Sequence, residues 1–518
     1  MPLCAADLPL RYNCVDIVER NLRERAAKQA LFSAERTLTF AEVAAELNRV
    51  GNALRRLGVR EGEYVALLSL DGAEWVTSFF GIVKIGAIAI GMNTLQKPYE
   101  VEYILNDARP RVAIVHEALL PTLEAVRESV PFLEHVVVIG TPARSGDHAF
   151  AAWVAAESPE CVAAPTHRED FCSLNYSSGT TGEPKGILHA HKDYPITAQL
   201  WGVDVLGIRE DDRTFAGAKL FFTFGLGGNL IFPWYAGASV VLLSGSPRDP
   251  KNVLDTIDRF KPTILYNAPT GYAATLAVPE FTQRWDLSSL RLGVSAGEAL
   301  PAPIWKQWKE ATGVPIVDGI GSTEAFHIFI SNHPQDIRPG SSGRPVPGWE
   351  VRLVDDEFHD VPQGEIGNLL VKGEATALSY LHQSERSRKT YLGEWLFTGD
   401  KYLVDEQGYW WHAGRSDDML KVGGIWTSPV EVESALIEHA AVLECAVIGQ
   451  TDASDLVKPK AFVVLRPGHT PCDALAQELV THCVDRLAAY KRPRWIEFVD
   501  ALPKTATGKI QRFKLRGA

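Results

Sequence analysis

The chain has 518 residues, which is too long for one hydrophobic core and indicates two or more domains. Apolar residues make up 46% of the chain and charged residues 22%, as in ordinary globular proteins. The net charge of −12 argues against a nucleic-acid binder or a binder of anionic membranes, because either usually needs a basic face.

The seven cysteines include no C-x-x-C pair, and their number is odd. This pattern is typical of reduced thiols and not of a disulfide framework or a zinc site. The first twelve residues lack the apolar core of a signal peptide, and the most apolar stretches, 79–92 and 230–243, are too short to span a bilayer. We therefore expect a cytoplasmic protein without a membrane partner.

The first clear element is a helix predicted over 39–57. Thr39 and Glu42 have the spacing of a capping box, apolar residues follow at intervals of three and four, and Gly58 ends the run. A buried strand over 64–70 should come next, followed by a second helix that Asp71 caps.

Strand-like runs then recur between helical segments, at 112–115, 135–139, 239–243 and 263–266. Such alternation indicates an α/β fold with largely parallel sheets. After Gly340, short strands at 351–354 and 367–372 predict a β-rich subdomain. The last part predicts a compact α+β unit with helices at 430–439 and 473–487 and strands at 444–449, 460–465 and 495–499.

The most informative segment is 176–186, which reads Y-S-S-G-T-T-G-E-P-K-G. Glycines let a backbone approach a ligand closely, and successive N–H groups in such a loop form an anion-binding concavity. The hydroxyls add donors, and Lys185 adds a positive charge. Because Gly186 follows Lys185, the segment is not a Walker loop, but it predicts a polyphosphate site.

This segment resembles the phosphate loop of the acyl-adenylate-forming enzymes, which include acyl-CoA and aryl-CoA ligases, carrier-linked adenylation domains and beetle luciferases. Further motifs follow in the order of that family, over roughly 173–509: S-A-G-E at 295–298, D-G-I-G-S-T-E at 318–324, F-T-G-D at 397–400, G-R-S-D-D at 414–418 and P-K-T-A-T-G-K at 503–509. The resemblance implies a large N-terminal adenylation domain (1–414) and a small mobile C-terminal domain (415–518). The hinge is expected near 412–418, with Asp417 as the hinge residue.

The resemblance also implies a site for ATP and Mg²⁺. Glu324 matches the family's metal-binding glutamate, which suits an ion that prefers oxygen ligands, and Thr323 matches a donor to phosphate. From the residues alone, a capped helix start explains this motif equally well. Asp400 and Arg415 are expected at the ribose hydroxyls. The residues implied for ATP are Ser177, Ser178, Gly179, Thr180, Thr181, Gly182, Lys185, Ala296, Gly297, Glu298, Asp318, Gly319, Thr323, Asp400 and Arg415.

Lys509 stands where the family has its catalytic lysine, so the implied catalytic residues are Lys509, Glu324 and Thr323. Lys509 would bridge the substrate carboxylate and the α-phosphate and stabilise charge by position and electrostatics. A carboxylate would attack the α-phosphate and release pyrophosphate, and a thiol would then displace AMP. The Gly-Lys context of Lys509 is similar to acetylated sites in related ligases, which makes a lysine acetyltransferase a candidate partner.

The segment 421–426 is expected to close a tunnel for the pantetheine arm of coenzyme A, through Lys421, Gly423, Gly424 and Trp426. From turn chemistry alone, a plain hairpin turn fits the same residues.

The acid-binding segment of the family aligns with 219–228, and together with 324–332 it most resembles the benzoate–CoA ligase branch. We therefore predict a small aromatic acid, either benzoate or a hydroxy- or otherwise substituted benzoate. Its pocket is expected from Phe224, Asn267, Ile320, Gly321 and His327. A core strand, an Asn267 that satisfies only backbone groups and a packed His327 remain alternatives.

Other functions share these motifs: loading of an aryl acid onto a carrier protein, a CoA ligase for an alicyclic or short-chain acid, and luciferase-like chemistry. A binding protein without catalysis is disfavoured, because Lys185, Glu324, Asp400, Arg415 and Lys509 are all present. We expect an aromatic acid, ATP and coenzyme A as partners, no nucleic acid, and a monomer or homodimer.

Overall fold

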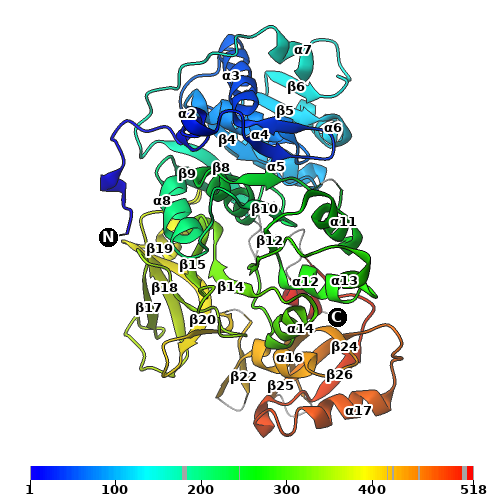
Figure 1. Cartoon of the computed structure of the whole chain (residues 1–518). Coiled ribbons are helices and arrows are strands. Elements are labelled where there is room, and N and C mark those ends of the chain that lie inside the picture. Colours follow the sequence, from blue (N-terminus) through cyan, green and yellow to red (C-terminus); the bar gives the residue numbers. More distant parts are fainter. Residues whose placement is uncertain are drawn as a thin grey trace.

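The computed structural model describes residues 2–177, 184–243, 245–416, 418–422, 425–452, 456–504 and 510–516. Two large sheets, a β-rich unit and a C-terminal α+β unit follow one another along the molecule (Figure 1). This arrangement confirms the predicted fold class. No helix in the described part combines the length and apolar character that a bilayer crossing needs.

The first sheet lies in the N-terminal third of the chain. Its neighbouring strands are parallel except for the last pair, in which β8 and β9 run antiparallel on either side of the glycine-rich loop. The strand order is β7 (His148–Ala149), β6 (His135–Ile139), β5 (Val112–His116), β3 (Tyr64–Leu68), β4 (Ile88–Gly91), β8 (Phe171–Ser177) and β9 (Lys185–Ala190).

Helices α3 (Phe40–Arg56) and α4 (Ala73–Lys84) pack closely on each other in this part of the molecule. The predicted capping box is confirmed, since the Thr39 side chain accepts from the Glu42 N–H. The expected cap of α4 is wrong: Gly72 is its N-cap, and Asp71 instead accepts the backbone N–H of Leu220 at 3.3 Å. The Asp71 carboxylate, which local spacing had predicted as the helix cap, thus accepts from a residue distant in the sequence.

The second sheet holds the centre of the chain. Six of its strands, from β14 to β1 in the sheet order, are parallel, and antiparallel strands flank them at both edges. The order is β16 (Arg344–Pro345), β15 (Ile328–Ser331), β14 (Ile316–Gly321), β13 (Leu292–Ser295), β12 (Ile264–Asn267), β10 (Arg213–Ala216), β11 (Ser239–Val241), β1 (Gln29–Phe32) and β2 (Thr37–Thr39).

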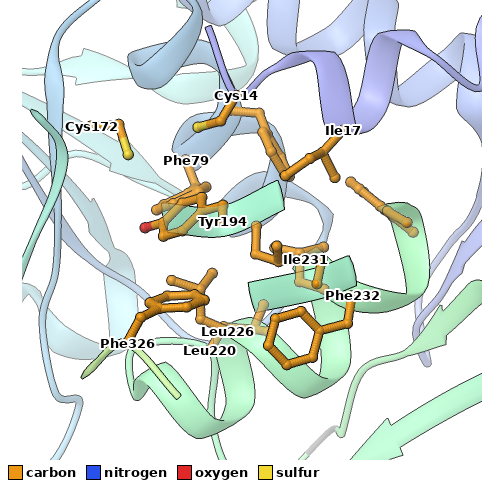
Figure 2. Packing of buried hydrophobic residues seen from close by; sticks show 14 of the residues in the cluster. Cys14, Ile17, Phe79, Cys172, Tyr194, Leu220, Leu226, Ile231, Phe232 and Phe326 are labelled. Atoms are coloured by element: carbon orange, nitrogen blue, oxygen red, sulfur yellow. The ribbon is translucent and has the colours of Figure 1, made fainter. Parts of the chain in front are cut away.

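The apolar core fills the space between these elements. Figure 2 shows side chains from distant segments converging there, among them Phe79, Tyr194, Phe232 and Phe326. Further helices surround the sheets: α5 (Pro98–Ala108), α8 (Asp193–Thr197), α11 (Pro250–Phe260), α12 (Pro269–Leu276) and α14 (Ala302–Thr312). Because ligands bind at the carboxyl ends of parallel strands, the ends of β12, β13 and β14 mark where a site is expected.

The β-rich unit and the C-terminal unit complete the fold. Val432 and Leu436 of α16 share a buried apolar cluster with Trp308 of α14, so the C-terminal unit packs against the second sheet's helices (Figure 1). The elements are β17 (Glu350–Val354), β18 (Gly367–Lys372), β19 (Tyr391–Leu392), β20 (Trp395–Val404), β21 (Trp410–Arg415), β22 (Leu420–Val422), β23 (Ile425–Thr427), α16 (Pro429–Ile437), β24 (Val442–Thr451), β25 (Val457–Leu465), α17 (Asp473–His482), β26 (Trp495–Phe498) and α18 (Arg512–Leu515).

The contact of α3 with α4 leaves no room for a side chain at Gly81. A Cβ there would lie 2.8 Å from Val50 Cβ and 2.9 Å from the Leu47 carbonyl oxygen. We expect Gly81→Ala to lower the free energy of unfolding by about 1–3 kcal/mol through overpacking, measured by urea denaturation. Gly72→Ala is the control, because the nearest atom to its Cβ is a Glu74 carboxylate oxygen at 3.4 Å. Equal stability of the two variants would contradict this account.

Candidate functional site

The glycine-rich loop leaves one sheet edge and returns to it. Ser177 ends β8, Lys185 begins β9, and the two residues pair across the strands. The Ser177 hydroxyl is buried without a hydrogen-bond partner in the described part of the chain, so a donor beside the loop remains for a ligand oxygen. The predicted loop residues Ser178, Gly179, Thr180, Thr181 and Gly182 lie outside the described residues.

Lys185 forms an ion pair with Glu324, whose Oε1 lies 2.5 Å from the lysine Nζ. Tyr380 donates its hydroxyl to the same oxygen at 2.8 Å. Burial alone would raise the pKa of Glu324, but the charge of Lys185 and the hydrogen bonds from Lys185 and Tyr380 outweigh burial and lower the pKa to about 2. Glu324 is therefore a carboxylate, which fits the oxygen ligand that Mg²⁺ prefers.

The turn that carries Thr323 and Glu324 depends on two glycines. β14 and the antiparallel β15 lie so close together that a Cβ at Gly319 would be 2.7 Å from the Ile330 oxygen. A Cβ at Gly321 would be only 2.2 Å from the His327 oxygen. A short helical turn (Thr323–Ala325) follows, capped by the Ser322 hydroxyl. The G-x-G spacing is thus required by the hairpin that presents Glu324.

Phe326 closes this turn in a strained conformation. Its φ is 63°, and its neighbours are joined by a hydrogen bond from the His327 N–H to the Ala325 oxygen at 2.8 Å. This is a γ-turn with positive φ, which is rare for a residue with a side chain. The buried Phe326 ring packs 4.5 Å from the Tyr194 ring and 5.3 Å from the His189 ring, centroid to centroid. Packing therefore holds the strained backbone between Glu324 and His327.

Asp400 and Arg415 meet across neighbouring strands. They are register partners in β20 and β21, and the carboxylate lies 3.2 Å from the Arg415 Nη1. His412 approaches the same carboxylate at 3.5 Å. Asp400 and Arg415 are fifteen positions apart in the sequence, and strand pairing brings them together.

The segment S-A-G-E lies at the carboxyl end of β13, beside β14. Ser295 and Asp318 are register partners, and burial raises the pKa of Asp318 to about 8. Gly297 has a φ of 96°, a conformation that favours glycine. Ala296 is buried, and Glu298 accepts the backbone N–H of Ile510 at 3.0 Å. This bond joins the C-terminal segment to the predicted nucleotide site.

Two of the residues predicted for the acid pocket, Phe224 and His327, lie in an aromatic cluster. The His327 ring packs against Trp201, Phe224 and Phe232, with centroid distances of 4.8, 5.5 and 4.7 Å. Burial lowers the pKa of His327 to about 3, so the ring is neutral. Its Nε2 lies 3.2 Å from the Phe224 oxygen, which can only accept, so Nε2 carries the hydrogen and Nδ1 is an acceptor.

That His327 Nδ1 atom is buried and has no hydrogen-bond partner among the described residues. Ile320 belongs to β14 beside the same turn. Asn267 ends β12, and its Oδ1 accepts the Ala268 N–H at 3.0 Å, a local backbone contact of the kind considered as the alternative for this residue. The aromatic cluster therefore offers one buried acceptor to a ligand.

The segment predicted for coenzyme A forms an antiparallel hairpin of β22 and β23, in which Lys421 pairs with Trp426. Gly423 and Gly424 between them, the hinge residue Asp417 and the catalytic Lys509 all lie outside the described residues.

One further group has the composition of a metal site. Ligand atoms of the buried residues Cys14, Cys172 and His191 lie within 4.8 Å of one another. However, His191 Nδ1 already accepts the Cys14 backbone N–H at 3.1 Å, which uses the lone pair that a metal would need.

Several side chains of the site lacked any motif in the sequence. Tyr380 reaches Glu324 from a segment far along the chain, and Trp201 and Phe232 reach His327 from segments with π-helical turns. His189 lies four residues after Lys185 on the same strand face, and this alternation is the one signal that could have found it.

Comparison with known proteins agrees with this geometry. The AMP-binding enzyme family matches residues 18–381, and the C-terminal domain of AMP-binding enzymes matches 431–509. The benzoate–CoA ligase of Thauera aromatica is 47% identical, over 99% of this chain and 97% of the relative.

Solved structures give the same result. An anthranilate CoA ligase in complex with anthranoyl-AMP superposes with a TM-score of 0.97 and 67% identity, covering 99% of this chain and 98% of that one. A benzoate CoA ligase from Burkholderia xenovorans LB400 gives a TM-score of 0.91 and 40% identity, covering 98% and 100%.

These findings confirm the resemblance inferred from the motifs and the predicted use of ATP, Mg²⁺ and coenzyme A. The chain belongs to the AMP-binding enzyme family, in its benzoate–CoA ligase branch, and is an AMP-forming ligase that joins an aromatic carboxylate to coenzyme A through an acyl-adenylate.

Proposed function

We propose that the aromatic acid is 2-aminobenzoate, which this enzyme converts to 2-aminobenzoyl-CoA. The observation that carries the proposal is the 67% identity to an anthranilate CoA ligase, against 47% to a benzoate–CoA ligase. The neutral His327 supports it, because its buried Nδ1 is an acceptor suited to an aromatic N–H. Benzoate, the alternative substrate, has no ring donor to offer.

The test is a substrate panel: 2-, 3- and 4-aminobenzoate, 2-hydroxybenzoate, benzoate and cyclohexanecarboxylate, compared by kcat/KM for CoA-thioester formation. We expect 2-aminobenzoate to exceed benzoate by about tenfold or more, because a buried acceptor left unpaired costs free energy. His327→Phe should reduce that ratio towards one. A wild-type enzyme that prefers benzoate would overturn the assignment of the acid, whereas the two-step chemistry would stand.

The residue roles follow from the family motifs and the geometry together. The phosphate loop with Lys185 would hold the triphosphate, Thr323 would donate to phosphate, and Glu324 would be the ligand of Mg²⁺, which supplies positive charge at the phosphates. Asp400 and Arg415 would hold the ribose. The segments at 296–298 and 318–319 would flank the base, and the 421–426 hairpin would border the pantetheine arm.

Lys509 would complete the site for the first half-reaction. Its chain neighbour Ile510 bonds Glu298, which supports a position of the C-terminal unit against the nucleotide site. The substrate carboxylate would attack the α-phosphorus while pyrophosphate leaves, and the thiol of coenzyme A would then attack the acyl carbon while AMP leaves. Between the steps, the unit from 415 onward would swing about Asp417, which removes Lys509 and brings in the hairpin.

We further propose that the protein acts in the cytoplasm as a monomer or homodimer and that a lysine acetyltransferase silences it at Lys509. Acetylation would remove the charge of that ammonium group. Protein carrying acetyl-lysine at this position should fail to form the adenylate; a normal adenylation rate would refute the regulatory role.

Removing the ammonium group of Lys509 should separate the two half-reactions. We expect Lys509→Ala to slow adenylate formation, followed by pyrophosphate exchange, by about 100-fold or more, as for the loss of a group that stabilises the transition state. Thioester formation from added aryl-adenylate and coenzyme A should persist. Lys514→Ala, at an exposed position of α18, is the control. If exchange is undiminished in Lys509→Ala, the proposed mechanism is wrong.

Tyr380 offers a second test of the site. Tyr380→Phe removes the O–H that Glu324 Oε1 accepts, and we expect the KM for MgATP to rise by about tenfold to hundredfold, the range for one hydrogen bond to a charged group. Tyr391→Phe is a matched control, because its hydroxyl is buried without a hydrogen-bond partner in the described part, and its ring lies 5.3 Å from that of Tyr380. Equal effects of the two variants would argue that only packing matters.

A further inference from the structure

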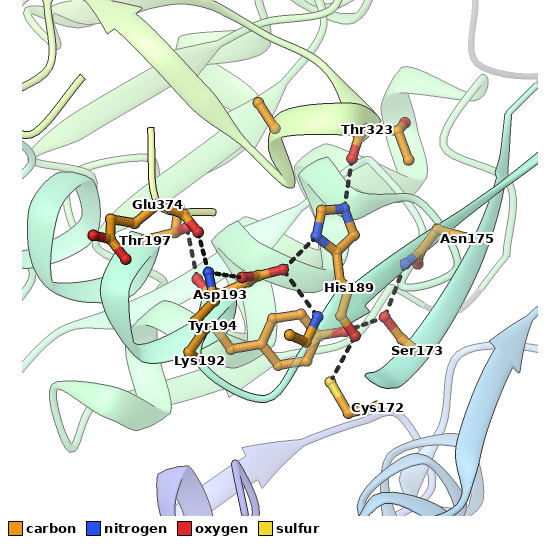
Figure 3. Close-up of polar contacts among 12 residues, drawn as sticks. Cys172, Ser173, Asn175, His189, Lys192, Asp193, Tyr194, Thr197, Thr323 and Glu374 are labelled. Atoms are coloured by element: carbon orange, nitrogen blue, oxygen red, sulfur yellow. Dashed lines mark hydrogen bonds and ion pairs between the residues drawn. The ribbon is translucent and has the colours of Figure 1, made fainter. Parts of the chain in front are cut away.

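Strand β9 contacts the Thr323–Glu324 turn at two points. Lys185 binds the Glu324 side chain, and His189, four residues later on the same strand face, lies with its Nε2 2.7 Å from the Thr323 backbone oxygen. Figure 3 shows the His189 ring lying between Thr323 and Asp193, which comes from the start of α8. Strand β9 thus holds the main chain of the turn through His189 and the Glu324 carboxylate through Lys185.

The partners of His189 determine where its hydrogens are. The Thr323 carbonyl can only accept, so Nε2 must donate. On the other side, Nδ1 lies 2.9 Å from Asp193 Oδ2, which also accepts the Ala190 N–H at 2.9 Å. Lys192 Nζ lies 3.5 Å from the other oxygen of Asp193. The hydrogen of this contact lies between Nδ1 and Oδ2, so His189 is hydrogen-bonded through both ring nitrogens and links Asp193 to the turn.

The His189 ring also contacts Phe326, the strained residue of the turn. The Phe326 ring packs on His189 and on Tyr194, and Tyr194 donates its hydroxyl to Ser173 at 2.6 Å. A backbone with positive φ persists only where its surroundings over-determine it. The bond from Nε2–H to Thr323 and the packing of Phe326 together supply that constraint.

We propose that His189 and Asp193 are positioning residues for adenylate formation: the hydrogen-bonded pair fixes the main chain at Thr323 and thereby the places of the Thr323 hydroxyl and the Glu324 carboxylate. Neither side chain touches substrate, and both act through the turn. The proposal rests on the proposed roles of Thr323 and Glu324 in binding MgATP. A purely structural histidine would instead support folding and leave the two half-reactions equally affected.

The test compares His189→Leu, which removes both donors, with His189→Gln, whose amide can still donate to Thr323. Adenylate formation, followed by pyrophosphate exchange, should fall about tenfold to hundredfold in His189→Leu and recover in part in His189→Gln. Thioester formation from added aryl-adenylate, which does not need the triphosphate site, should stay within about threefold of the wild-type rate.

The matched controls are His191→Leu and His191→Gln, since His191 is equally buried on the same segment but contacts Cys14 and not the turn. Both half-reactions should change together in these variants, if at all. Equal loss of both half-reactions in His189→Leu, or no gain in His189→Gln over His189→Leu, would overturn the positioning role.

A second measurement does not depend on activity. In protein with ¹⁵N-labelled histidine, the signal that disappears in His189→Gln should show hydrogen on Nε2, as the bond to the Thr323 carbonyl requires. A ring without hydrogen on Nε2 would refute that bond. If Lys509→Ala slows pyrophosphate exchange but His189→Leu does not, the positioning role alone is refuted. If neither variant slows exchange, the proposed mechanism itself is refuted.

Discussion

The ion pair of Lys185 with the buried Glu324 carboxylate joins the two large sheets of the molecule. Lys185 begins the last strand of the first sheet, and Glu324 follows a strand of the second, so the pair spans their junction. A buried charge without its partner is strongly destabilising. The same ion pair therefore fixes both the relative placement of the two sheets and the charge balance of the site. On the proposed roles, MgATP gives each partner a new counter-charge, phosphate for the lysine and metal for the carboxylate.

The C-terminal unit is held in a different way. Arg512 binds Glu433 at 2.8 Å and Arg516 binds Asp418 at 2.5 Å, all within that unit. One polar contact between this unit and the nucleotide segment is the bond from the Ile510 N–H to Glu298. The ion pairs inside the unit would keep it intact during the rotation that we propose between the two half-reactions.

The sequence predicted those features whose signal is local. The helix that begins after Thr39 and the strands at 135–139 and 367–372 have strong periodicity or capping, and the structure has them at those places. The wrong cap of α4 arose because Asp71 has a tertiary partner. Motifs identified Lys185, Glu324, Asp400 and Arg415. Tyr380 and the contact of His189 with Thr323 could not be read in the same way, because tertiary packing, not spacing, brings these distant segments together.

The absence of space at the glycines around the proposed acid pocket limits how such an enzyme can change its substrate. A Cβ at Gly227 would lie 2.5 Å from His327 Cδ2, and one at Gly228 would lie 2.6 Å from the Tyr266 ring. At these two glycines and at Gly321, a larger residue would collide with backbone or ring atoms. A change in the aromatic acid that the enzyme accepts, in nature or in the laboratory, is therefore expected at the large surrounding side chains, such as Phe224 and Trp201. These side chains can be replaced by smaller ones.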